Sequence, residues 1–198
     1  MVCHLFWCFF VLQLKSCSLS SFNLICSLFV VIPAKPENLR VKEKTAYSAY
    51  LEWSVPYPMT NFPPGLVQRV EYLPQWESRD SWHRANTSVL NTKHSKHELN
   101  ITTLKYANTL YDVRVYMKSA KANLNDDSLW SAPAGITIKT RPDIPGAAPR
   151  TDIGSFEVFN HVDSRDIYLY WQTIPDYLQN GDGFSYKIIS VEENGKPV

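Results

Sequence analysis

The side chains that could carry out chemistry are few in this sequence, and their spacing is poor for catalysis. His94 and His97 lie three positions apart in KHSKH, so on a strand they would face opposite sides and make a weak metal pair. Asp126 and Asp127 lack the series of oxygen ligands found in a calcium loop. The motifs of nucleotide binding, serine hydrolysis and zinc proteolysis are absent from the sequence. We therefore expect a protein that is not an enzyme and has no metal and no cofactor.

A tryptophan among small polar residues, Trp130 in NDDSLWS, is the more informative feature. The strand expected before it, LYDVRVYMK, alternates inward and outward residues, and its outward residues are Arg114, Tyr116 and Lys118. We expect Trp130 to lie flat on this outer face and to stack on Arg114 or Lys118.

The neighbours of this tryptophan are expected to fix it in place. Ser128 and Ser131 can bond through their hydroxyls to nearby backbone, and Asp127 can pair with a cation of the strand at 110–118. The predicted role is structural, because such a clamp would stiffen the domain from outside its core.

The composition indicates a domain with a packed core and no strongly charged surface. Apolar residues make up 44% of the 198 residues, and the net charge is +1. Acidic and basic residues alternate along the chain, so we expect no nucleic-acid partner. The sequons at Asn86 and Asn100 are candidate glycosylation sites and favour a secreted or cell-surface location.

Residues 1–33 differ from the rest of the chain. They hold two apolar runs and all four cysteines, Cys3, Cys8, Cys17 and Cys26. Neither run reaches the roughly 20 residues that span a bilayer. A signal peptide is the preferred interpretation. A signal anchor and an artefactual start of the sequence remain alternatives.

Alternating apolar residues after this segment predict an all-β fold. Period-two runs bounded by turn residues predict strands at 37–44, 47–56, 66–74, 81–90, 97–104, 110–118 and 135–140. Seven short strands in about 100 residues are typical of a β-sandwich. We expect Trp53 in its core and Tyr111 to form a tyrosine corner. For Trp82 a core position is preferred, and an edge position is the alternative.

A second copy of the pattern indicates tandem domains. DIYLYWQTIP repeats the strand that carries Trp53, so Trp171 is expected in a second core. The proline-rich segment KTRPDIPGAAP separates the copies. We predict one sandwich at 34–142 and the N-terminal part of a second at 143–198, which would make the chain a fragment of a longer protein.

The segment DSLWS, followed by AGITIKTRP and later by YWQTIP, NG and Y, resembles class I cytokine receptors of the interleukin-6 signal-transducer type. The segment DSLWS is similar to the W-S-x-W-S box of this family, with Asp127 where the family has the first tryptophan. The resemblance covers most of residues 34–198. It implies tandem fibronectin type III domains in a single-pass cell-surface receptor. The family's membrane-distal domain, with its paired cysteines, has no counterpart here.

The resemblance also implies partners and a binding site. The partners would be a secreted helical cytokine, a second receptor chain in a homo- or hetero-dimer, and a JAK kinase reached through a cytoplasmic part outside this sequence. Ligand contacts would come from two loops at one end of the sandwich, through Tyr57, Met59, Phe62, Lys121, Asn123 and Leu124. Packing of Tyr57 and Phe62 onto the sandwich is the alternative for the first loop, and an ordinary solvated hairpin is the alternative for the second. A structural or adhesive fibronectin type III protein is the alternative function.

Overall fold

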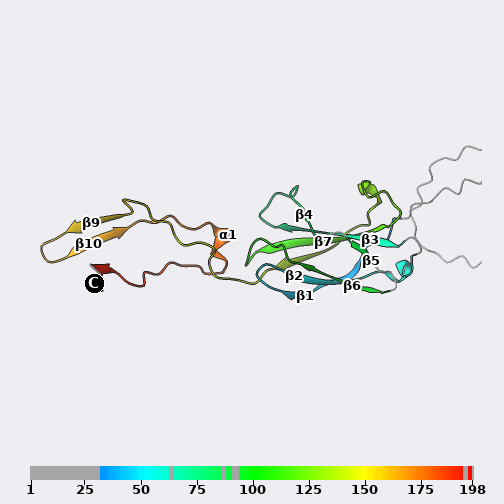
Figure 1. The fold of residues 1–198 in the computed structure, drawn as a ribbon, viewed down its shortest axis with the longest axis horizontal. Coiled ribbons are helices and arrows are strands. Elements are labelled where there is room, and N and C mark those ends of the chain that lie inside the picture. The colour runs from blue at the N-terminus through cyan, green and yellow to red at the C-terminus, as the bar shows by residue number, and fades with distance from the viewer. Residues whose placement is uncertain (1–31, 63–64, 86–87, 91–93, 194–195, 198) are drawn as a thin grey trace, which may run out of the picture.

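The described part of the chain begins with two antiparallel sheets packed face to face (Figure 1). A computed structural model describes residues 32–62, 65–85, 88–90, 94–193 and 196–197. The first sheet has the order β1 (Glu37–Lys44), β2 (Ala49–Ser54), β6 (Lys96–Ile101). The second has the order β4 (His83–Arg84), β3 (Leu66–Pro74), β7 (Leu110–Ser119), β8 (Ala134–Lys139), and β5 (Ser88–Leu90) also pairs with β3. This arrangement is a fibronectin type III sandwich, so the predicted all-β fold is confirmed.

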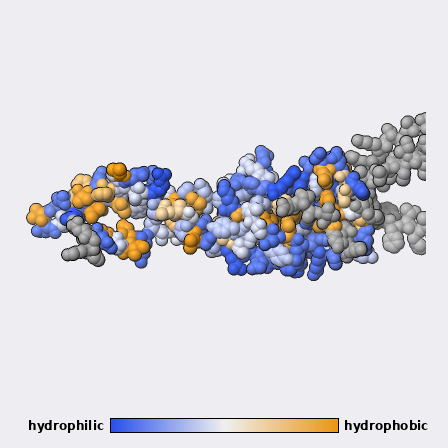
Figure 2. All heavy atoms as spheres, in the orientation of Figure 1, coloured by the Kyte–Doolittle hydropathy of each residue, from blue (hydrophilic) through white to orange (hydrophobic). Residues whose placement is uncertain are grey.

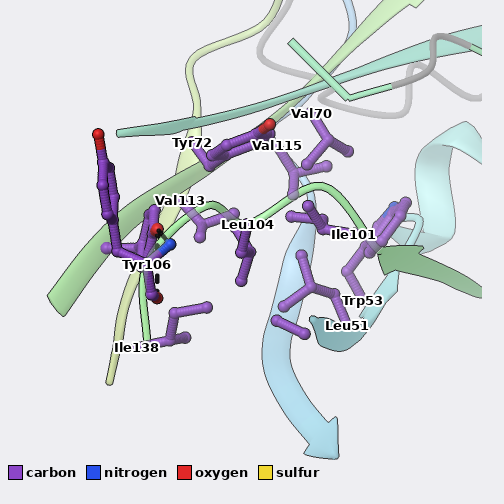
Figure 3. Close-up of a cluster of buried hydrophobic side chains, with 12 residues drawn as sticks. Leu51, Trp53, Val70, Tyr72, Ile101, Leu104, Tyr106, Val113, Val115 and Ile138 are labelled. Carbon is purple, nitrogen blue, oxygen red and sulfur yellow. Dashed lines mark hydrogen bonds between the residues drawn. The ribbon is translucent and has the colours of Figure 1, made fainter. Parts of the chain in front are cut away.

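The core lies between the two sheets and follows the predicted alternation. The inward residues of β2 and β7 are almost fully buried and point toward one another (Figure 3). This cluster consists of Ala49, Leu51, Trp53, Val70, Tyr72, Ile101, Leu104, Tyr106, Tyr111, Val113, Val115 and Ile138. Burial of each large apolar side chain contributes about 1.5–3 kcal/mol. The sandwich therefore holds together by burial.

A smaller apolar cluster closes one end of the sandwich. It consists of Val55, Met59, Leu66, Leu90 and Met117, with Phe62 packed against it. Met59 belongs to a short 3-10 helix, η1 (Tyr57–Met59), in the loop after β2. This loop is therefore anchored from below by its own apolar side chains.

The tyrosine corner is present as predicted. The Tyr111 hydroxyl accepts a hydrogen bond from the Tyr106 backbone N–H at 2.9 Å and donates one to the Tyr106 carbonyl at 3.4 Å. Burial raises the pKa of Tyr111 to about 12. Leu104, in the same connection, packs in the core below it.

We expect Tyr111→Phe to lower the free energy of unfolding by about 1–2 kcal/mol, because the buried Tyr106 N–H would lose its acceptor. The contribution of Tyr111 to stability should be constant below pH 10 and should be lost between pH 10 and about 12, where the unfolded chain releases a proton that folded Tyr111 retains. The loss would be about 1.4 kcal/mol per pH unit. Urea unfolding across this range checks both effects, and the variant should lack Tyr111's part of the alkaline loss. An unchanged alkaline profile in the variant would contradict this assignment.

Residues after 142 form a more open region. It contains the hairpin of β9 (Phe156–Asn160) and β10 (Arg165–Leu169), a short helix α1 (Asp176–Gln179), and the pair β11 (Glu192–Glu193) and β12 (Lys196–Pro197). Apolar side chains are visible on its surface in Figure 2. In the described parts of the chain, no helix has the length and apolar character needed to cross a membrane.

The prediction that Trp171 lies in a core is wrong for this structure. Trp171 is 38% exposed, and Ile167 and Leu169 on the same strand face are also exposed. The physical reason is that the β9–β10 hairpin has no second sheet against it among the described residues. A two-stranded hairpin cannot bury a tryptophan by itself.

Candidate functional site

The outer face of the second sheet carries a continuous stack of aromatic and cationic side chains. Arg114, Tyr116 and Lys118 point outward from β7, because Val113, Val115 and Met117 point into the core. On β3, Arg69 pairs directly with Tyr116 across the sheet. The arginine and the tyrosine of neighbouring strands therefore share one outer face.

Trp130 lies against this face between two cations. The guanidinium of Arg69 is 4.5 Å from the centre of the Trp130 ring, and the Lys118 ammonium is 5.0 Å from it. Trp130 is only 9% exposed although it lies outside the core. The expected stacking on Lys118 is present. The alternative stacking on Arg114 is not, because Arg69 of β3 occupies that position.

Arg114 stacks on a different tryptophan, Trp82, for which the preferred core position is wrong and the alternative edge position holds. The Arg114 guanidinium lies 3.4 Å from the centre of the Trp82 ring. Trp82 is partly exposed, because it precedes the short edge strand β4 and lies on the outer face. A tryptophan beside an edge strand can reach over the sheet exterior, which inward alternation does not predict.

These contacts form a ladder of six residues, which we call the outer ladder: Trp82, Arg114, Tyr116, Arg69, Trp130 and Lys118. Its middle contacts are Arg114 to the Tyr116 hydroxyl at 3.4 Å and Arg69 to the Tyr116 ring at 4.8 Å. Each exposed cation–π contact contributes about 0.5–1 kcal/mol, and more when water is excluded. The outer ladder thus connects β3, β7 and both flanking loops.

Asp127 pairs with the outer ladder, although not with the strand that was predicted. Its carboxylate accepts a hydrogen bond from Arg69 at 2.7 Å, whereas a cation of the strand at 110–118 was expected. This bond holds the pKa of Asp127 below its usual value. Arg69 also lies 3.2 Å from the Glu71 carboxylate. Arg69 therefore contacts two rings and two carboxylates.

The two serines beside Trp130 differ in what they bind. The Ser131 hydroxyl accepts a hydrogen bond from the Met117 backbone N–H at 3.0 Å, and the Ser131 N–H donates to the Met117 carbonyl at 2.8 Å. Ser128 instead bonds to Asp126, in the 3-10 turn η2 (Asp127–Leu129). Ser131 therefore ties the loop to β7, whereas Ser128 shapes the turn itself.

Lys118 reinforces this turn from below. Its ammonium donates a hydrogen bond to the Asp126 carbonyl at 2.6 Å, and burial lowers the pKa of Lys118. A buried lysine that bonds to a loop carbonyl holds that loop close to the sheet. The loop from 120 to 133 is thus fixed at its C-terminal part.

The predicted ligand-contact residues separate into exposed and buried groups. Tyr57 is 91% exposed and Leu124 is 58% exposed, and Lys121 and Asn123 are also exposed. Met59 is 2% exposed and Phe62 packs on the same cluster, so these two support the loop instead of projecting from it. The alternative of packing down therefore holds for Phe62 and not for Tyr57.

Both loops lie at one end of the sandwich, opposite α1 (Figure 1). They are joined by a hydrogen bond from the Ala120 N–H to the Gly65 carbonyl at 3.0 Å. Gly65 has a φ of +76°, a conformation that residues with a side chain rarely adopt, so the bend favours glycine. The exposed residues of the two loops therefore form one surface, which we call the loop end: Tyr57, Lys121, Asn123 and Leu124.

The glycosylation candidate that the structure describes, Asn100, lies away from the loop end. Asn100 is exposed on β6, where it pairs with Tyr50 of β2. Asn86 lies outside the described residues. Within the described ranges, no group of three or more His, Cys, Asp or Glu side chains is arranged to hold a metal ion.

Sequence reasoning missed Arg69 and misplaced Trp82. Arg69 could have been found, because Val70 and Tyr72 share the apolar face of LVQRVEYLP and Arg69 must then lie on the opposite face. Its neighbours across the sheet depend on strand register, which a single sequence does not reveal. No comparable signal marks Trp82.

The fold and the outer ladder define the class of protein as a fibronectin type III sandwich with a cation–π stack on its exterior. No family model matches the chain. The chain is 32% identical over 172 residues to a protein of Drosophila melanogaster named "Cytokine receptor". That alignment covers 85% of this chain and 12% of the relative's length. The similarity supports a relationship to cytokine receptors.

Solved structures with similar folds include a computationally redesigned β-sandwich protein and a myokine. The redesigned protein is 20% identical with a TM-score of 0.37, and the match covers 54% of this chain and 94% of the other. The myokine is 19% identical with a TM-score of 0.39, and the match covers 55% of this chain and 98% of the other.

Proposed function

We propose that this chain is an extracellular part of a cell-surface cytokine receptor of the interleukin-6 signal-transducer type, similar to the insect receptor Domeless. The observation that carries the proposal is the position of Trp130, which follows DSL and lies between Arg69 and Lys118 on the sheet exterior. The similarity to a Drosophila cytokine receptor across most of the chain supports it independently.

The outer ladder acts as a support for ligand binding rather than as the binding surface. It fixes the loop from 120 to 133 through Trp130, Ser131 and Lys118. Leu124 is displayed from this loop, and Tyr57 from its neighbour. A rigid loop loses less conformational entropy on binding, so the same contacts give a tighter complex.

The loop end has the chemistry of a small protein interface. Tyr57 offers an exposed aromatic ring, and Leu124 offers an apolar anchor beside the polar Lys121 and Asn123. Aromatic and apolar anchors surrounded by polar residues are typical of binding hot spots. We assign this surface to a secreted helical cytokine.

The remaining features of the receptor are part of the same proposal. Residues 34–142 and 143–198 are assigned to successive fibronectin type III domains, with residues 1–33 as a signal peptide or apolar leader and with Asn86 and Asn100 glycosylated. The full-length protein would cross the membrane once, act as a homo- or hetero-dimer without enzymatic activity of its own, and signal through a JAK kinase and STAT factors.

We expect Tyr57→Ala and Leu124→Ala each to weaken cytokine binding about tenfold, because each would remove an apolar anchor from the loop end. The measurement is a titration of the full chain, displayed on yeast, with a panel of purified fluorescent four-helix cytokines. Thermal unfolding should change little, because both side chains are exposed.

Matched controls are Tyr168→Ala and Leu110→Ala, which remove exposed side chains far from the loop end. Both should bind as tightly as the wild type. If no helical cytokine binds, or if the controls weaken binding as much as the loop-end variants, the proposed function is wrong. A structural or adhesive fibronectin type III protein would then be the better assignment.

A further inference from the structure

The connection between the sandwich and the following region has almost no free length. The Arg141 N–H donates to the Thr45 carbonyl at 3.0 Å, and the Arg141 carbonyl accepts from the Asn108 N–H at 3.0 Å. Two residues later, the Asp143 N–H donates to the Asn180 carbonyl at 2.9 Å. Only Pro142 separates the two anchored residues, and its ring fixes its own φ.

Asp143 is held from both sides of the connection. Its carboxylate raises the pKa of the Tyr47 hydroxyl, which belongs to the sandwich, so the two side chains lie near each other. Its backbone N–H binds the segment after α1. Gly146 continues the pairing, because its N–H donates to the Leu178 carbonyl at 2.7 Å.

An aromatic cluster joins the same two regions. The ring centres of Trp76 and Tyr106, both in the sandwich, are 4.7 Å apart. Tyr177 of α1 lies 5.5 Å from Tyr106 and 6.0 Å from Trp76, so its ring contacts both. Aromatic pairs at these separations attract each other beyond their burial of surface.

Hydrogen bonds of the turn after α1 also link the sandwich to the region that follows it. The Asp182 carboxylate accepts hydrogen bonds from Lys139 and from Asn108, both at 2.9 Å. Asn180 is buried, takes a positive φ of 59°, and donates from its side-chain amide to the Ile144 carbonyl at 2.7 Å. The turn after α1 is therefore shaped to bind the connection as well as the sandwich.

We propose that residues 141–146 and 176–182 form a locked elbow, which holds the sandwich and the region after it at one fixed angle without any ligand. The backbone anchors hold the connection itself, and the aromatic cluster ties α1 to the sandwich, so bending at the connection would break several contacts together. The elbow would fix the orientation of the region after residue 142 relative to the sandwich, and so relative to the loop end at the sandwich's other end. The proposal stands whether or not the chain binds a cytokine.

The aromatic cluster should matter more than the ion pair. Asp182 is largely exposed, and water and salt weaken exposed charge pairs. The rings of Trp76, Tyr106 and Tyr177 contact one another directly, and such ring contacts are not weakened by salt, although Trp76 and Tyr177 remain about half exposed. Tyr177→Ala is therefore the variant expected to open the elbow most.

Two measurements on the full chain test the proposal: one reports the angle between the sandwich and the region after it, and the other reports the backbone hydrogen bonds of the connection. Spin labels on noncanonical amino acids at Thr102 and Arg150, both exposed, report the distance across the elbow by double electron–electron resonance. The wild type should give one narrow distribution, and Tyr177→Ala should broaden it at least about twofold. Hydrogen exchange of the Asp143 and Gly146 amides should accelerate about tenfold in the variant.

Asp176→Ala is the matched control, because Asp176 lies next to Tyr177 but its carboxylate accepts a hydrogen bond from Gln179, within α1. It should leave the distance distribution and both amides unchanged. Circular dichroism melting confirms that the sandwich itself stays folded in each variant. A broad distribution in the wild type, or a narrow one with protected amides in Tyr177→Ala, would overturn the locked elbow.

Discussion

Replacing Trp130 with alanine is expected to lower the free energy of unfolding by about 3–5 kcal/mol, the range for a buried large aromatic residue. The ring is 9% exposed and lies between the Arg69 and Lys118 side chains, so its loss leaves a cavity and two cations without their aromatic partner. A domain of this size has a total stability of about 5–15 kcal/mol. Urea unfolding followed by circular dichroism measures the change.

Trp82→Ala is the matched control for this prediction. Trp82 is partly exposed and contacts one cation of the outer ladder, Arg114. Its removal should cost about 1–2 kcal/mol. Equal losses for the two tryptophans, or a loss below about 1 kcal/mol for Trp130, would mean that Trp130 is not held as the structure places it.

Replacing Arg69 with alanine is expected to cost about 2–4 kcal/mol. Arg69 stacks on the rings of Tyr116 and Trp130, and it also lies 3.2 Å from the mostly buried Glu71 carboxylate. The variant would lose two cation–π contacts and leave a partly buried carboxylate with a weaker partner. Chemical unfolding at constant pH and salt measures the change.

Two further variants separate charge from shape. Arg69→Lys keeps the positive charge but removes the planar group that stacks between the rings, so it should recover less than half of the loss. Arg84→Ala removes a more exposed arginine that also pairs with Glu71, and it should change stability by less than about 1 kcal/mol. Full recovery by lysine would show that stacking on the rings contributes little.

Much of the sandwich could be predicted because alternation reports directly which face of a strand is buried. Trp53, Val113 and Val115 were expected inside and are inside. The strand expected at 81–90 instead divides into β4 and β5, both paired with β3. Edge strands as short as β4 have too few residues for alternation to locate them.

The outer ladder was predicted only in part because its partners come from different strands. Trp130 and Lys118 were expected to meet, and they do. Arg69 is 61 positions before Trp130, and only the register of β3 against β7 brings it opposite Tyr116. Trp171 shows a related limit, because alternation predicts the face of a residue but not whether another sheet covers that face.

The most direct test of the central claim is the hydrogen-exchange footprint of a helical cytokine bound to the full chain. The account predicts slower exchange at the loop end, in peptides covering 55–62 and 119–126. Peptides covering β4 and the first part of β7 should exchange as in the free protein, because the outer ladder supports these loops without touching the ligand. Protection over the outer ladder with an unchanged loop end would contradict the account.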